Sequence, residues 1–187
     1  MAGIGLRLVK QSGMVDGYTG GLNEFPIDPD NDQPIFTGDP VWLDASGFVE
    51  EAIGAQAAGD FTIAGVFAGC RYVDTDGSIK FRNQWDGVAG RSDVIATIAI
   101  PFGGVFHVRG AAGTDYGAAA YAGIRFGMVY NAGDAQTGDS RSTLSAATAA
   151  AGPLLVQRLV DLPNNNLDDE PLFECAIVRQ QTSFIAP

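Results

Sequence analysis

The sequence predicts a mainly β protein: an antiparallel β-sandwich or barrel, jelly-roll or tulip-like, with an extended N-terminal arm. Short apolar runs recur about every 8–12 residues, separated by Gly, Pro, Asn and Asp, a pattern typical of such folds. No helical periodicity persists beyond about ten residues. The 187 residues, 46% of them hydrophobic, suffice for one domain with a sizeable core. We place the arm at residues 1–37 and the β-domain at residues 38–187.

The arm contains one short predicted strand, at residues 6–10, followed by a stretch dominated by Gly, Asp, Asn and Pro. Residues 25–29 alternate apolar residues with proline and aspartate, which a helix interior does not tolerate. The apolar side chains of the arm are too scattered to form a core of their own. We therefore expect part of the arm to become ordered against a neighbouring molecule, with Phe25 and Ile27 filling pockets on it.

The block from Gly38 to Trp85 contains four predicted strands, at residues 41–43, 48–49, 63–72 and 79–82. Residues 45–47 and 74–78 have the Gly, Ser and Asp content of tight turns. Gly65 and Gly69 interrupt the third strand and indicate bulges or a close backbone approach.

The rest of the chain continues this pattern. Further strands are predicted at residues 93–101, 105–109, 124–130, 154–162 and 172–179. A helix is possible at residues 116–121, although the surrounding glycines weaken it, and residues 142–151 are compatible with helix or strand.

The chain is strongly acidic, with a formal net charge of −11 and lysine only at positions 10 and 80. Such a surface repels phosphate, so we expect no nucleic-acid partner, whereas a basic patch on a protein partner remains compatible with it. The N-terminus lacks a basic stretch followed by a long apolar run, and no run approaches the roughly 18 apolar residues of a membrane span. These features predict a protein made in a cytoplasm.

No pattern of catalytic or metal-binding residues is recognisable, so we expect no enzyme activity, cofactor or metal site. His107 is the only histidine and has no evident orienting partner, which favours a structural or surface role. The Asp74–Ser78 stretch resembles the start of a calcium loop, but its glycine comes too early and Trp85 stands where a glutamate is needed. No lysine and hydroxyl pair follows the Gly-rich stretches to make a phosphate loop.

Cys70 and Cys175 both lie in apolar runs, which predicts two buried free thiols; a disulfide would require neighbouring strands. A serine at position 70 is expected to disturb the core for lack of a hydrogen-bond partner. Trp42 and Trp85 are suited to the core or to a subunit interface, or else to a sugar-stacking platform. We expect the acidic residues 168–170 to lie in a solvated loop or to meet basic residues on a protein partner.

Several motifs occur in an order that resembles the capsid decoration (cement) proteins of tailed bacteriophages. The central motifs are GDPV at residues 38–41, AGVFAGCRY at residues 64–72, the Asp76-Gly77 turn and Trp85. The resemblance extends to LRLVK at residues 6–10, VFHV at 105–108, LVDLPNN at 159–165 and AIVR at 176–179. It spans most of the chain except residues 109–151.

The resemblance implies a virion structural protein that binds the outer face of a phage head, usually as a homotrimer, and braces neighbouring capsomers. Its partners would be the major capsid protein and further copies of itself, after synthesis in the host cytoplasm. The candidate interface residues are Phe25, Ile27, Trp42 and Trp85. The alternative is a carbohydrate-binding β-sandwich module on a virion surface, for which Tyr116 and Tyr121 are the best stacking candidates.

Overall fold

The computed structural model describes residues 5–11, 21–52, 62–117, 121–167 and 170–181. The secondary structure of these residues is almost entirely β, as predicted. The strands are β1 (Arg7–Gln11), β2 (Leu22–Pro26), β3 (Ile35–Phe36), β4 (Pro40–Leu43), β5 (Val49–Glu51), β6 (Gly65–Val73), β7 (Ile79–Arg82), β8 (Gln84–Trp85), β9 (Ser92–Ala99), β10 (Gly104–Arg109), β11 (Arg125–Val129), β12 (Thr143–Thr148), β13 (Leu154–Leu159) and β14 (Leu172–Ile177). In the described part of the chain, no helix is long and apolar enough to cross a membrane.

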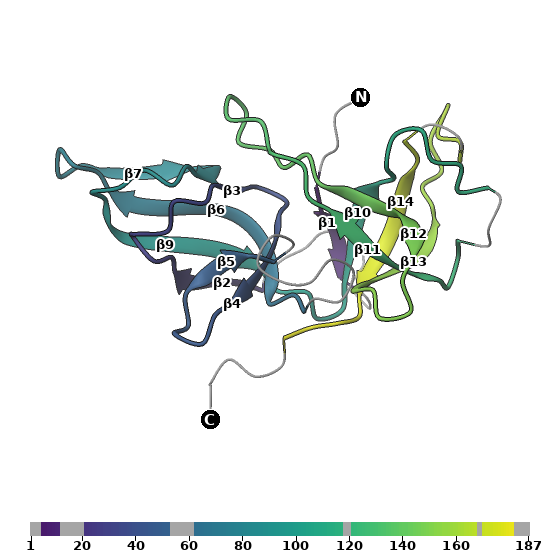
Figure 1. The fold of residues 1–187 in the computed structure, drawn as a ribbon, viewed down its shortest axis with the longest axis horizontal. Coiled ribbons are helices and arrows are strands. Elements are labelled where there is room, and N and C mark those ends of the chain that lie inside the picture. The colour runs from purple at the N-terminus through teal and green to yellow at the C-terminus, as the bar shows by residue number, and fades with distance from the viewer. Residues whose placement is uncertain (1–4, 12–20, 53–61, 118–120, 168–169, 182–187) are drawn as a thin grey trace.

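The strands form two large antiparallel sheets in a sandwich-like arrangement, which confirms the predicted fold class. Sheet I has the order β1-β10-β14-β13-β11-β12. Sheet II has the order β2-β9-β6-β4-β5, with β7 also paired to β6, and β3 pairs with β8 in a small ribbon. Figure 1 shows sheet II at one end of the molecule and sheet I at the other.

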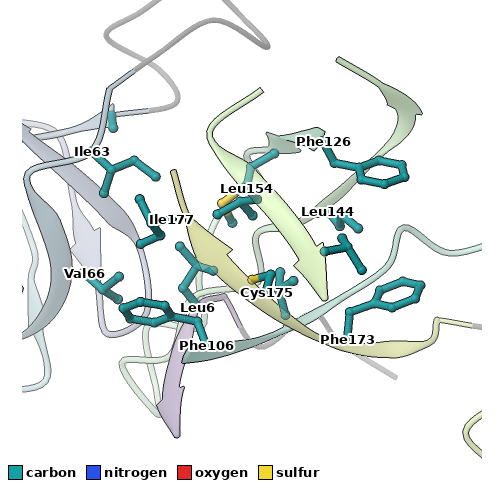
Figure 2. Close-up of a cluster of buried hydrophobic side chains, with 14 of the residues drawn as sticks. Leu6, Ile63, Val66, Phe106, Phe126, Leu144, Leu154, Phe173, Cys175 and Ile177 are labelled. Carbon is teal, nitrogen blue, oxygen red and sulfur yellow. The ribbon is translucent and has the colours of Figure 1, made fainter. Parts of the chain in front are cut away.

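Each sheet has its own hydrophobic core. The core of sheet I is built around Phe106, Phe173 and Cys175, and side chains from the sheet II region, among them Ile63 and Val66, reach into it (Figure 2). The core of sheet II is built around aromatic and β-branched residues of the N-terminal half of the chain. Its buried members are Ile27, Ile35, Val41, Leu43, Val49, Ala64, Phe67, Cys70, Tyr72, Trp85, Val94, Ala96 and Ile98. Because Ile63 and Val66 belong to the first core, packing joins the two sheets.

The described strands of the N-terminal segment pair with the chain's own sheets. β1 is the edge strand of sheet I, and β2 pairs with β9 along five residues at the edge of sheet II. Ile27 is almost completely buried in the second core, whereas Leu6 is buried in the first. The expectation that Ile27 fills a pocket on another molecule is therefore wrong, because its side chain already has a place in its own core.

The turn chemistry of the central block is confirmed. Gly47 and Gly77 have φ angles of 84° and 78° in the two predicted tight turns. At Gly69, where φ is 140°, the pairing of β6 with β9 shifts register, as expected of a bulge. The ambiguous stretch at residues 142–151 contains β12. Of the possible helix at residues 116–121, residues 118–120 lie outside the described residues, and Tyr116 and Gly117 are not helical.

A buried polar junction joins the segment after β3 to the loop before β12. The Asp39 side chain is fully buried; its Oδ2 accepts a hydrogen bond from the Phe36 amide at 2.9 Å, and its Oδ1 accepts one from the Ser142 hydroxyl at 3.3 Å. The backbone is tied here as well, since the Leu6 amide donates to the Gly38 carbonyl at 2.7 Å. The junction thus holds segments that are far apart in the sequence.

A candidate docking face

The outer face of sheet II carries a row of side chains fixed by strand register. Cys70 and Tyr72 of β6 point into the second core, so Arg71, which lies between them, points outward. In register with Arg71 are Ile95 of β9 on one side and Phe81 of β7 on the other. Pro26 of β2 pairs with Ile95, and Val73 pairs with Ile79. We call Pro26, Val73, Ile79, Phe81 and Ile95 the outer patch.

Two residues of the outer patch are unusually exposed for their size. The exposed fraction is 76% for Phe81 and 64% for Ile79. Both lie on β7, whose four residues are all paired with β6, so they are held on a regular sheet rather than on a loose loop. Large apolar side chains that cluster on a rigid surface mark an interaction site rather than ordinary surface variation.

β7 also concentrates positive charge in an acidic chain. Its sequence alternates Ile79 and Phe81 with Lys80 and Arg82 and contains no acid. Lys80 lies 3.9 Å from Asp76, an exposed and therefore weak pair. Arg82 is exposed and takes part in no ion pair found within the described ranges. This strand is therefore a local cationic site.

The outer edge of β7 is unpaired within the part of the chain that the structure describes. Among the described residues β7 pairs only with β6, along Cys70 to Val73. Strand β4 pairs with the same edge of β6, but at its other end, at Gly65 and Val66. Figure 1 places β7 at the end of the molecule remote from sheet I. Beside it, residues 81–84 and 135–138 line a shallow groove of about 210 Å³. An apolar patch, two cations and an open strand edge thus occur together.

Trp85 is not available to a partner. Its ring is fully buried, its Nε1 donates to the Asn31 carbonyl at 3.0 Å, and it meets the Tyr72 ring edge-to-face with centroids 6.0 Å apart. The Arg91 guanidinium lies 4.2 Å from the centroid of the Tyr72 ring and covers this pair. Trp85 is therefore a core residue, which corrects the expectation that it contacts a partner.

The other predicted interface residues do not form one surface. Phe25 is half-buried against the second core and Ile27 lies within it, whereas Trp42 is half-buried against the first core. The exposed pair, Ile79 and Phe81, was not among the interface residues predicted from the sequence. The available signal was the strict alternation of apolar and basic residues in a four-residue strand after a tight turn, but alternation alone does not show which face is buried.

His107 has an orienting partner that the sequence did not reveal. The carboxylate of Glu174, on the neighbouring strand β14, lies 3.7 Å from His107 Nε2. Arg158 of β13 holds the same carboxylate through two hydrogen bonds of 2.8 and 2.7 Å. The result is a row of ionisable side chains across three strands of sheet I, in which the buried carboxylate is satisfied by the arginine, as expected for a structural group.

Both cysteines are free and buried, as predicted. Burial raises the pKa of the Cys70 thiol to about 12 and that of Cys175 further, so both thiols stay protonated at neutral pH. Cys70 Sγ donates to the Gln84 carbonyl at 3.2 Å. The expectation that a serine here lacks a partner is therefore wrong.

The Asp74–Ser78 stretch forms the hairpin turn between β6 and β7, in which Asp76 accepts hydrogen bonds from the amide and the hydroxyl of Ser78. Within the described ranges, no group of three His, Cys, Asp or Glu side chains is placed to hold a metal ion.

Tyr116 is buried, with its hydroxyl within hydrogen-bonding distance of the Leu144 and Ser145 carbonyls, and Tyr121 packs against the first core. The proposed sugar-stacking rings thus belong to or line the core.

Comparison of the chain with protein-family models, with curated proteins and with solved structures finds no match. What the protein does must therefore be inferred from its own residues. Of its surfaces, the outer patch of sheet II, together with the edge of β7, combines the most features of a binding site.

Proposed function

We propose that this chain is a virion structural protein, a capsid decoration (cement) protein. It binds the outer face of a phage head and stabilises contacts between capsomers. Its partners are the major capsid protein and further copies of itself in a homotrimer, and its role is to hold neighbours together rather than to catalyse a reaction. The order of the motifs from residue 6 to residue 179, which resembles that family, supports this proposal.

The outer patch is the observation that carries the docking role. Phe81 and Ile79 project from a paired strand, so little conformational entropy is lost when a partner covers them. Full burial of a side chain of this size contributes about 1.5–3 kcal/mol. Two such side chains on one rigid strand supply a central apolar contact of the kind that dominates protein interfaces.

The net charge of −11 suits a protein that must stay soluble and avoid the genome until it meets a capsid. Repulsion between free copies lowers non-specific association, while Lys80 and Arg82 place positive charge on the same strand as Ile79 and Phe81, on its opposite face. This distribution favours a protein partner over a nucleic acid.

Attachment to heads that lack the protein tests the proposal. Wild-type protein should co-sediment with such heads, and Phe81→Ser should lower the affinity about tenfold or more through lost apolar burial. The matched control is Phe102→Ser, because Phe102 is 75% exposed but lies outside the outer patch. Both variants should unfold at the wild-type urea concentration. Failure of the wild type to attach, or equal attachment of the two variants, would contradict the proposal.

The homotrimer is tested by mass. In a closed ring of three copies, each copy joins one surface to a different surface of its neighbour, so every interface is satisfied. The protein should therefore have three times the chain mass by light scattering, both free and after release from heads. A monomeric mass in both states would refute this part of the proposal.

A further inference from the structure

We propose that β7 accepts an additional β-strand from its partner and that this partner segment is extended and carries acidic side chains. The inference rests on the proposed function for the source of the segment, a capsid subunit. It specifies how the docking face works and which chemistry it selects.

One backbone edge of β7 is unpaired among the described residues. Its four residues pair with β6 from Val73↔Ile79 to Cys70↔Arg82. On the opposite side none of the strands in the described part of the chain pairs with it. Backbone groups along such an edge form hydrogen bonds with an incoming extended segment, which is a common mode of peptide recognition.

The side chains of β7 select the sequence of that segment. Ile79 and Phe81 lie on the outer face, and Lys80 and Arg82 on the other face. Residues of an added strand alternate between the same two faces, and directly opposite side chains interact. The segment should therefore alternate apolar residues beside Ile79 and Phe81 with acidic residues beside the two cations.

A second copy of β7 is a poor occupant. Antiparallel pairing of two β7 strands would bring Lys80 and Arg82 of one copy beside those of the other, and like charges at opposed positions destabilise a sheet. The same cations attract an acidic segment. The groove lined by residues 81–84 and 135–138 adjoins the Arg82 end of the strand and gives space for the segment to continue.

The test uses the full chain and defined peptide probes. The first probe is an acetylated, amidated octapeptide of alternating valine and glutamate, the second has lysine in place of glutamate, and the third is the first with alternate amides methylated. Binding is followed by the shifts of β7 amide signals in NMR titrations. The glutamate peptide should bind about tenfold more tightly than the lysine peptide, and amide methylation should abolish binding.

Charge reversal identifies the residues. The double variant Lys80→Glu with Arg82→Glu should invert the peptide preference. The matched control is Arg125→Glu, because Arg125 is also exposed but lies on β11 of sheet I, and it should leave the preference unchanged. Equal affinity for the two charged peptides, binding that survives methylation, or an unaltered preference in the double variant would overturn the inference. So would dimerisation through β7 in sedimentation experiments.

Head attachment separates this inference from the proposed function. If wild type and the double variant attach to heads equally well, the strand-addition inference fails while the decoration function stands. If wild type binds the glutamate peptide through β7 but does not attach to heads, the decoration function fails while the recognition mode stands.

Discussion

Replacement of Asp39 tests the energetics of the junction between the two sheets. Burial raises the pKa of this carboxyl from 3.8 to about 6, against the opposing effect of its hydrogen bonds to Ser140, the Phe36 amide and Ser142. Because the native state binds the proton of Asp39 more tightly than the unfolded state does, the contribution of Asp39 to stability is greatest below about pH 4 and is lost as the pH rises through 6. Tyr130 lies close enough for its own pKa to be raised, mainly by burial and also by the charge of Asp39.

The size of the effect follows from the pKa difference. At about 1.4 kcal/mol per pKa unit, ionisation of Asp39 costs the native state about 3 kcal/mol at pH 7.5. Asp39→Asn removes that charge and keeps an oxygen to accept from the Phe36 amide. The variant should therefore gain up to about 3 kcal/mol over wild type at pH 7.5 and almost nothing at pH 4. Asp39→Ala instead leaves the amide unsatisfied and should lose about 1–3 kcal/mol relative to Asp39→Asn.

Urea unfolding of the three proteins between pH 4 and pH 7.5 provides the measurement. The difference between wild type and Asp39→Asn cancels the titration of the other carboxyl groups, which both proteins share. A difference that stays constant across this pH range would refute the reasoning, because it would show that Asp39 titrates alike in the native and unfolded states.

Two further substitution pairs test the cores by urea unfolding. Cys175→Ser should cost about 1–3 kcal/mol because Cys175 is completely buried in the first core. Cys70→Ser should lower the free energy of unfolding by less, because the Gln84 carbonyl can accept a hydrogen bond from the serine hydroxyl as it does from the thiol. Equal losses for the two variants would contradict this role of the Gln84 carbonyl. Ile27→Ala should cost about 2–5 kcal/mol, whereas Leu22→Ala, at a side chain 55% exposed on the adjoining β2, should have little effect. Similar losses of stability for Ile27→Ala and Leu22→Ala would show that Ile27 is not packed in the second core.

Strand positions were predicted best where β-forming side chains and flanking turn residues both indicate the same strand. β4 and β6 are β-branched and aromatic runs bounded by Pro, Gly or Asp, and both were predicted within a few residues of their ends. β2 was missed because it exposes most of its side chains, so it shows no apolar alternation, and because it contains Pro26. Proline is tolerated there because β2 is an edge strand, a fact set by the tertiary arrangement.

The docking face was harder to predict, since an aromatic residue suits the core and an interface equally well. Trp85 and Phe81 both lie in the central block, yet one is fully buried and the other is 76% exposed. The difference depends on which face of each strand meets the core. For the short strands β7 and β8 this depends on their pairing partners, which no local pattern specifies.

The bulge at Gly69 connects the core of sheet II with the outer patch. Phe67 and Cys70 both point into the second core although they are an odd number of residues apart, which regular alternation forbids. The extra residue at the bulge resets the alternation, so that Tyr72 is buried and Arg71 faces outward. A regular strand that kept Phe67 inside would instead turn Arg71 into the core and Tyr72 out of it. The same glycine that allows a continuous apolar core therefore also determines which side chains sheet II presents to a partner.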